Sequence, residues 1–204
     1  VIAYDAAGGA IAARLWWLLR WVGHEHVALL DGGFPAWVRA GLPLEEGAAD
    51  PVSPLSQYPV RPGSMPTVTT PEVEAALGNR EFTLLDARDA QRFAGAVEPI
   101  DPVAGHVPGA LNWPFSENLR PDGRFLPAAA LRTRLQQWLP ATAGAERPVV
   151  SMCGSGVTAC HTLFALDYAG LAAQLNPPPA LYVGSWSEWV QVADRPVARG
   201  ANAG

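Results

Sequence analysis

Residues 149–166 read "VVSMCGSGVTACHTLFAL" and lead from an apolar strand, through a turn that contains two glycines, into a helix. The strand is predicted over 147–153 and the helix over 157–171, with Gly170 ending the helix. The carboxyl ends of parallel strands carry the working loops of α/β folds. This stretch therefore predicts both the class of the fold and the place of a functional site.

Strands and helices alternate on either side of this stretch. Apolar strands are predicted at 82–88 ("FTLLDAR") and 180–184 ("ALYVG"), and the apolar spacing at 126–139 predicts a helix. A long polar loop is expected after the first of these strands. Another helix is expected to begin at Thr70, because a hydroxyl can cap free N–H groups ahead of Pro71. The alternation predicts an α/β fold with a mainly parallel sheet flanked by helices.

The chain divides into three segments by composition. Residues 1–46 read as strand, helix, strand, helix, and two strands cannot enclose a core, so they are expected to be the second half of a domain. Residues 47–66 are rich in proline and small residues, which favours an extended linker. Residues 67–200 predict one complete α/β domain. Because the chain starts at Val1 inside an apolar run and lacks an initiating Met, we expect it to be a fragment.

Composition and charge narrow the classes of partner. The 204 residues carry a formal net charge of −5 without a run of Lys or Arg, which argues against a nucleic-acid partner. The longest apolar stretch, 10–23, is too short to span a bilayer and contains two arginines, so no membrane partner is expected. Two cysteines and four scattered histidines form neither a disulfide framework nor a metal pattern, and no cofactor is implied. A reducing cytoplasm is the expected compartment.

The turn after the strand has the composition of an anion cradle around Cys153. Gly154 and Gly156 permit backbone conformations closed to other residues, and Ser155 and Thr158 add hydroxyl donors. Successive N–H groups at the positive end of a helix dipole would stabilise a thiolate or a persulfide anion. The alternative is that Cys153 is a small buried core residue, as unpaired cysteines often are. The glycines and hydroxyls favour the cradle.

Other residues near this stretch are interpreted as packing. Cys160 lies two helical turns after the first cysteine in an apolar run, and His161 has no spacing partner for a metal. Tryptophans are expected to pack the core or to wall the pocket, namely Trp113, Trp186 and Trp189.

The motif "CGSGVTAC" (153–160) resembles the active-site loop of the rhodanese superfamily, in particular that of its two-domain 3-mercaptopyruvate/thiosulfate sulfurtransferases. "LLDAR", "GHVPGALNWPF" and "LYVGSWSEW" resemble the catalytic C-terminal domain of that family, in the same order. Residues 1–46 resemble the second half of the inactive N-terminal domain, with Asp5 at the position of the cysteine. The resemblance implies transfer of sulfane sulfur from a small-molecule donor to a thiol, thioredoxin or cyanide through a Cys153 persulfide.

The resemblance also implies a substrate-binding set. The loop lacks the basic pair typical of thiosulfate enzymes, so it looks like the mercaptopyruvate branch, and the carboxylate of the donor is expected to meet Arg88 and Arg92. The alternative for these arginines is an ion pair with Asp86 or a solvated surface charge. His106 is expected to anchor a turn. The implied site comprises Cys153, Gly154, Ser155, Gly156, Val157, Thr158, Arg88 and Arg92.

In mercaptopyruvate enzymes the loop serine is thought to join a His and an Asp of the N-terminal domain in a proton relay. Ser155 is the corresponding residue here, and its partners would lie in the half-domain expected to be missing. Mercaptopyruvate turnover by the chain alone is therefore an open question at this point.

Two other classes of function compete with this interpretation. Phosphatases of the related fold place an Arg six positions after the cysteine, where this chain has Ala159, and their loop is one residue longer. The second alternative is a persulfide carrier or interaction module that does not turn over a small-molecule donor. A mass gain of one sulfur on Cys153 without turnover would distinguish it.

Overall fold

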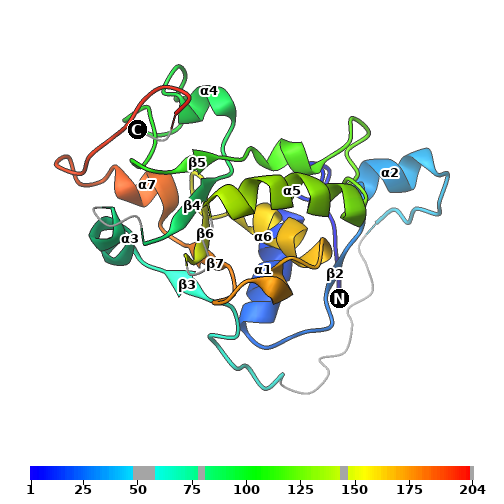
Figure 1. Cartoon of the computed structure of the whole chain (residues 1–204). Helices are drawn as coiled ribbons and strands as arrows, with labels where there is room; N and C mark the ends of the chain where they lie inside the picture. The colour runs from blue at the N-terminus through cyan, green and yellow to red at the C-terminus, as the bar shows by residue number, and fades with distance from the viewer. Residues whose placement is uncertain (48–57, 78–80, 143–146, 203–204) are drawn as a thin grey trace.

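The computed structural model describes residues 1–47, 58–77, 81–142 and 147–202, and a five-stranded sheet lies at its centre (Figure 1). All neighbouring strands pair in parallel, which confirms the predicted α/β class. Because the strands are parallel, their carboxyl ends meet at one edge of the sheet. In spatial order the strands are β3 (Thr67–Val68), β7 (Ala180–Tyr182), β6 (Val149–Met152), β4 (Thr83–Asp86) and β5 (Leu111–Asn112).

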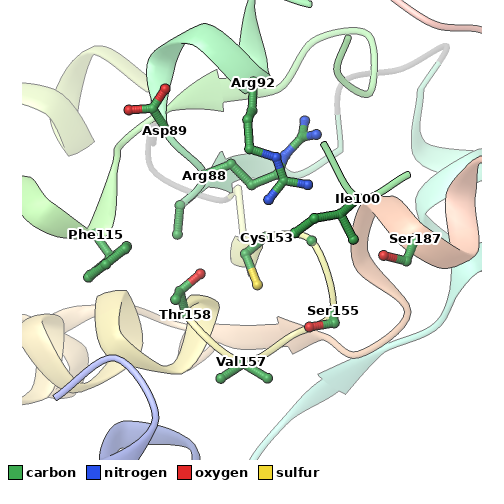
Figure 2. A pocket seen from close by; sticks show the side chains of 12 residues that line it. Arg88, Asp89, Arg92, Ile100, Phe115, Cys153, Ser155, Val157, Thr158 and Ser187 are labelled. Carbon is green, nitrogen blue, oxygen red and sulfur yellow. The ribbon is translucent and has the colours of Figure 1, made fainter. Parts of the chain in front are cut away.

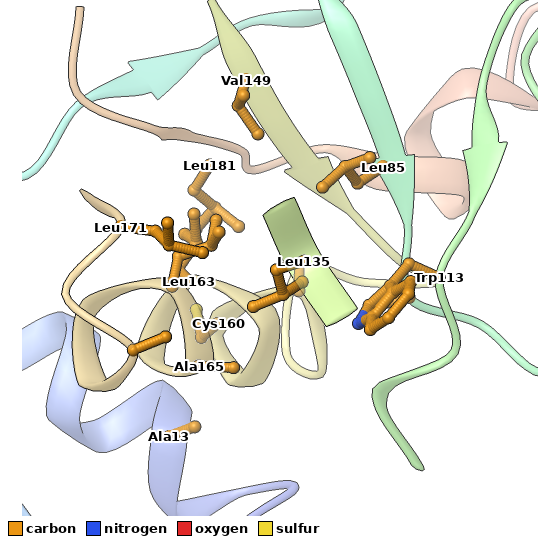
Figure 3. Packing of buried hydrophobic residues seen from close by; sticks show 14 of the residues in the cluster. Ala13, Leu85, Trp113, Leu135, Val149, Cys160, Leu163, Ala165, Leu171 and Leu181 are labelled. Carbon is orange, nitrogen blue, oxygen red and sulfur yellow. The ribbon is translucent and has the colours of Figure 1, made fainter. Parts of the chain in front are cut away.

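Helices cover both faces of the sheet, as predicted (Figure 1). Successive strand residues point to opposite faces, so Leu84 and Leu85 belong to two separate apolar clusters. One cluster lies under α1 (Ala12–Trp21), α5 (Ala128–Thr142) and α6 (Ala159–Tyr168), and Figure 3 shows its packing. The other lies under α3 (Thr70–Ala76), α4 (Ala90–Phe93) and α7 (Ser185–Trp189). Two short 3-10 helices, η1 (Phe115–Asn118) and η2 (Ala172–Gln174), complete the domain.

The first segment forms a small unit that shares the core of the larger domain. It comprises β1 (Ile2–Ala3) and β2 (Ala28–Leu29), which pair in parallel, with α1 and α2 (Gly33–Arg39). Trp16 and Trp17 of α1 are buried in the same apolar cluster as α6, and the ring of Trp16 meets Phe164 edge-on at 5.2 Å. The unit therefore buries its helix against the helix that follows the cysteine loop.

The predicted linker is described at Gly47 and from Tyr58 onward, since its residues 48–57 lie outside the described residues. Its described part runs along the end of α1: the Tyr58 hydroxyl donates to the carbonyl of Gly23 at 2.7 Å, and the Arg61 N–H donates to the carbonyl of Val22 at 2.9 Å. The boundaries at 46 and 67 stay predictions.

The structure corrects two local predictions. The cap of α3 is Thr69, not Thr70: Thr69 has an extended backbone, and its N–H donates to the Glu72 carboxylate at 2.7 Å. Thr70 is the first helical residue, and its buried hydroxyl bonds to the Tyr182 hydroxyl at 2.8 Å. The stretch after β4 was expected to be only a polar loop, but it contains α4, which begins because Asp89 caps its first turn.

None of the helices in the described ranges is long and apolar enough to cross a bilayer.

Candidate active site

Cys153 directly follows β6, in the centre of the sheet, and its loop leads into α6. Two contacts from the start of α7 fix the backbone here: the Cys153 N–H donates to the Ser185 hydroxyl at 3.1 Å, and the Trp186 N–H donates to the Cys153 carbonyl at 3.0 Å. The Ser187 N–H likewise donates to the Gly154 carbonyl at 2.8 Å. The sulfur-bearing residue is therefore held by β6 from one side and by α7 from the other.

The Cys153 side chain faces a pocket of about 300 Å³ (Figure 2). Only 2% of the residue is exposed, yet its sulfur points into this partly open pocket and is not sealed in the apolar core. Seven of the eight predicted site residues line the pocket, and Gly156 does not. The lining comprises Ala87, Arg88, Asp89, Arg92, Ile100, Phe115, Cys153, Gly154, Ser155, Val157, Thr158 and Ser187.

Gly156 shapes the loop without facing the pocket. Its φ of +74° lies in the left-handed region, and a Cβ added there would stand 2.8 Å from the carbonyl oxygen of Val183. Across the described ranges, the main-chain N–H groups of residues 154–158 donate to no protein acceptor. A turn that leaves five amides unpaired at the start of a helix is suited to bind an anion.

The loop after β1 is built in a similar way and already contains an anion. The carboxylate of Asp5 accepts four main-chain hydrogen bonds, from Ala7 at 2.8 Å, Gly9 at 2.9 Å, Ile11 at 2.8 Å and Ala12 at 2.8 Å. Burial raises the pKa of Asp5, but these four N–H groups outweigh it and hold the pKa below its usual value. The carboxylate is a fixed negative charge at the start of α1.

The two loops share a left-handed glycine at the same spacing, but they differ at the next residue, where Gly9 has φ +92° and Val157 has no positive φ. Gly8 stands three residues after Asp5 with φ +67°, and Gly156 stands three residues after Cys153 with φ +74°. Each loop follows a parallel strand and precedes a helix. The first loop therefore demonstrates, within this chain, that such a turn can surround a negative charge on its first residue.

Arg88 lines the pocket, but its guanidinium is committed to ion pairs. Its Nη2 donates to Asp86 Oδ2 at 2.6 Å and to the carbonyl of Gly105 at 2.7 Å, and its Nη1 donates to Glu98 at 3.4 Å. The guanidinium also lies over the ring of Trp186, 4.6 Å from its centre. With its side chain 1% exposed, Arg88 matches the ion-pair alternative, with Asp86 as its partner.

Arg92 is more open. It donates to Glu98 Oε1 at 2.7 Å and to Asp101 Oδ2 at 3.3 Å, both from Nη2. Burial raises the pKa of Glu98, but the hydrogen bond from Arg92 and the N–H groups of Asp101 and Ile100 bring it below its usual value. Arg92 and Ile100 both line the pocket that contains the sulfur (Figure 2). Arg92 is thus the better placed of the two predicted arginines to meet a ligand.

Cys160 packs beneath the loop, as predicted. Its thiol donates to the carbonyl of Gly156 at 3.4 Å, and burial raises its pKa to about 12, so it stays protonated. Arg14 of α1 reaches the same carbonyl at 3.5 Å and the Cys160 sulfur at 3.7 Å. The small N-terminal unit therefore touches the active-site loop directly.

His161 and His106 have structural roles. His161 Nε2 bonds to the carbonyl of Gly8 at 3.1 Å and its Nδ1 accepts from Asn118 at 3.2 Å, and burial lowers its pKa to about 4. His106 stacks on Phe93 and bonds to its carbonyl at 2.8 Å, which is the expected anchoring contact. Within the described residues no group of three His, Cys, Asp or Glu could hold a metal ion.

The three tryptophans expected to pack the core or wall the pocket are buried, and none of them lines the pocket.

Sequence reasoning missed several residues of this site. Glu98 and Asp101 lie in the stretch taken for a polar loop, and no motif distinguished them from solvated acids. Phe115 and Ser187 follow strands β5 and β7, so the rule that sites form at carboxyl ends of parallel strands could have found them. Arg14 gave no signal, because its contact joins segments 142 residues apart.

Comparison with known proteins agrees with this geometry. A model of the rhodanese-like domain matches residues 1–40 and 69–192. The chain belongs to the rhodanese-like family. One curated member, a probable 3-mercaptopyruvate sulfurtransferase from Pseudomonas aeruginosa, is 48% identical over 98% of this chain and 68% of its own length. A putative thiosulfate sulfurtransferase, SseB, from Mycobacterium tuberculosis is 41% identical over 98% of this chain and 67% of its own length.

A solved rhodanese-like structure leads to the same conclusion. The 3-mercaptopyruvate sulfurtransferase from Leishmania major superposes with a TM-score of 0.74 at 32% identity, covering 96% of this chain and 52% of that one. The chain thus spans about two thirds of the two curated relatives and about half of the solved one.

Proposed function

We propose that this protein is a sulfurtransferase that carries sulfane sulfur as a persulfide on Cys153. The observation that carries the proposal is the sulfur of Cys153 facing a partly open pocket from a turn with five unpaired amides. The filled cradle around Asp5 supports the idea that such a turn favours a negative charge. A thiolate at residue 153 is the nucleophile that sulfur transfer requires.

The first step loads the cysteine. The Cys153 thiolate attacks the sulfur of 3-mercaptopyruvate, a new S–S bond forms, and the C–S bond of the donor breaks with its electrons going to the pyruvate enolate. The proton of the persulfide then moves to the enolate, giving pyruvate and a Cys153 persulfide anion. The loop amides, which donate to no protein acceptor in the described residues, are proposed to stabilise the charge on the sulfur both before and after the transfer.

The second step returns the cysteine to its starting form. A thiol or cyanide acceptor attacks the outer sulfur, the S–S bond breaks, and the Cys153 thiolate leaves. With cyanide the product is thiocyanate, and with a thiol it is a new persulfide. A protein thiol such as thioredoxin is one acceptor of this class, and the reducing cytoplasm predicted from the cysteine content suits it.

The favoured donor is 3-mercaptopyruvate rather than thiosulfate. The relative at 48% identity bears the mercaptopyruvate name, whereas the relative at 41% bears the thiosulfate name. In the loop, Gly154 and Ser155 bring no positive charge to a dianion. Arg92, on the pocket wall, is proposed to take the single carboxylate of the donor.

The test is thiocyanate formation from cyanide with each donor. We expect turnover by the chain, its abolition in Cys153→Ser, and its retention in Cys160→Ala, which removes only the packing thiol. Activity that survives Cys153→Ser refutes the assignment. If the protein gains the mass of one sulfur on Cys153 without turnover, it is a persulfide carrier instead.

A further inference from the structure

An ion-pair cluster that borders the pocket has more carboxylates than guanidinium groups. Two guanidinium groups, of Arg88 and Arg92, are paired with three carboxylates, of Asp86, Glu98 and Asp101. The side chains of all three acids are at most 6% exposed. Ion pairs so far from solvent are screened weakly by salt. The cluster therefore has one uncompensated negative charge next to a pocket that is proposed to bind an anion.

Only one edge of this cluster is open to a ligand. Arg92 uses Nε and Nη2 on Glu98 and Asp101, and in the described part of the chain its Nη1 donates to no acceptor. A Cβ built on Gly154 would lie 3.6 Å from that same Nη1 and 3.7 Å from Nη2, so both terminal nitrogens approach the loop. The free N–H groups of Arg92 thus face the cysteine loop, and Figure 2 shows the guanidinium on the pocket side. One nitrogen with two N–H groups is suited to one carboxylate.

We infer that Glu98 and Asp101 make the site selective for a donor with one negative charge. They orient Nη1 of Arg92 toward one carboxylate, and their excess negative charge disfavours the binding of a dianion. This inference rests on the sulfurtransferase function proposed above and assigns donor selectivity to two residues that do not line the pocket. They are positioning residues, since they act through Arg92. Their carboxylates cancel most of the field that a free arginine would offer to thiosulfate.

The size of the effect follows from Coulomb's law. A unit charge roughly 8 Å from the second charge of a dianion, at an effective dielectric of about 20 and physiological salt, changes its binding on the order of three- to tenfold. A donor with one negative charge is affected less, because it interacts with the removed charge once, whereas a dianion does so at both of its charges. Asp89 also lines the pocket, but its carboxylate accepts the Gln91 N–H and turns away from the sulfur. Asp89 is therefore left unsubstituted in the variants that are compared.

The experiment compares the full chain with Asp101→Asn and Glu98→Gln, which remove one charge each and keep an acceptor oxygen. The control is Asp167→Asn, which removes the same charge from an exposed pair with Arg20 at the far end of α6. For each protein, kcat/KM is measured with thiosulfate and with 3-mercaptopyruvate, using cyanide as the acceptor. We expect the thiosulfate-to-mercaptopyruvate ratio to rise threefold or more in both variants and to stay within twofold in the control.

A second measurement does not depend on turnover. The alkylation rate of Cys153 with 2-bromosuccinate, a dianion, is divided by the rate with iodoacetate, a monoanion, and mass spectrometry identifies the labelled residue. Removal of a nearby negative charge should raise this quotient threefold or more in both pocket variants, with the control unchanged. Because the Asp101 bond to Arg92 is a single contact at 3.3 Å, Asp101→Asn decides the matter should Glu98→Gln fail to fold.

The outcomes separate the inference from the function on which it rests. If the unsubstituted protein turns over a donor and neither ratio rises threefold in a folded variant, the inference is overturned and the sulfurtransferase function stands. If the unsubstituted protein turns over neither donor, the proposed function fails, and the alkylation quotient alone supports or overturns the charge effect.

Discussion

Replacing Asp5 by Asn tests whether the loop amides stabilise a negative charge, and it does so by a stability measurement that needs no substrate or turnover. Asn has the shape of Asp but is neutral, and its amide nitrogen cannot accept a hydrogen bond. In the native loop, Oδ1 accepts from Ala7 and Gly9, and Oδ2 accepts from Ile11 and Ala12. Whichever way the Asn side chain turns, two of the four N–H groups lose their acceptor.

The loss can be estimated from those two bonds. Each is a hydrogen bond to a charged group, which usually contributes about 1.5–3 kcal/mol. Because Asp5 is only partly buried, we assign about 1 kcal/mol to each lost bond. With the weakening of the two remaining bonds, we expect the free energy of unfolding to fall by about 2–3 kcal/mol. For a chain of this size that lowers Tm by about 5–10 °C.

The assay is urea and thermal unfolding at neutral and acid pH. Because the folded pKa of Asp5 lies below its unfolded value, its contribution is complete above pH about 4 and is lost as the pH falls through the folded pKa. The gap between Asp5→Asn and the unsubstituted protein should therefore be full at pH 7 and narrow in acid. Asp167→Asn, at an exposed ion pair, should lose less than about 0.5 kcal/mol. An equally small loss for Asp5→Asn would refute the cradle argument.

Three further predictions concern the cysteine loop and its supports. Gly156→Ala places a Cβ 2.8 Å from the Val183 carbonyl at a left-handed φ, so we expect about 1–3 kcal/mol of destabilisation and at least a tenfold loss of thiocyanate formation; wild-type activity would contradict this. Arg14→Gln removes the contact with the Gly156 carbonyl and should slow iodoacetamide labelling of Cys153 severalfold while Tm moves little; an unchanged labelling rate would exclude a role for Arg14. His161 has a folded pKa of about 4 against about 6.5 unfolded, so protonation favours the unfolded chain and stability should fall by about 2 kcal/mol between pH 7 and pH 5. His161→Gln should flatten that slope in urea titrations, and an unaltered slope would assign it to other groups.

The fold was predictable from the sequence wherever apolar periodicity was strong. Strands β4, β6 and β7 and helices α5 and α6 lie inside the ranges predicted for them or within three residues of them. Strands β3 and β5 have only two residues each, too few to show an alternation, and they were not predicted. Their pairing depends on neighbours that are distant in sequence, so local patterns could not indicate them.

The site was predictable where its residues are consecutive and at the two arginines of the strand-end motif, Arg88 and Arg92, which also line the pocket. The loop from Cys153 to Thr158 follows from one strand–turn–helix pattern, and the structure places all of it except Gly156 on the pocket wall. The pairing of Arg92 with Glu98 and Asp101 depends on how the segment after α4 folds back, which sequence spacing does not encode. The roles of the site residues remain predictions until the variants are measured.

The shared packing of α1 and α6 has a consequence for dissection of the molecule. Ala13, Trp16 and Trp17 insert into the cluster that supports the sulfur-bearing loop from below. Deleting the first 46 residues would strip this cover and expose Phe164 and its neighbours to water, an apolar surface that invites self-association. The first 46 residues thus cover the helix on which the reactive loop depends, and a truncated chain is expected to associate through the surface that they leave behind.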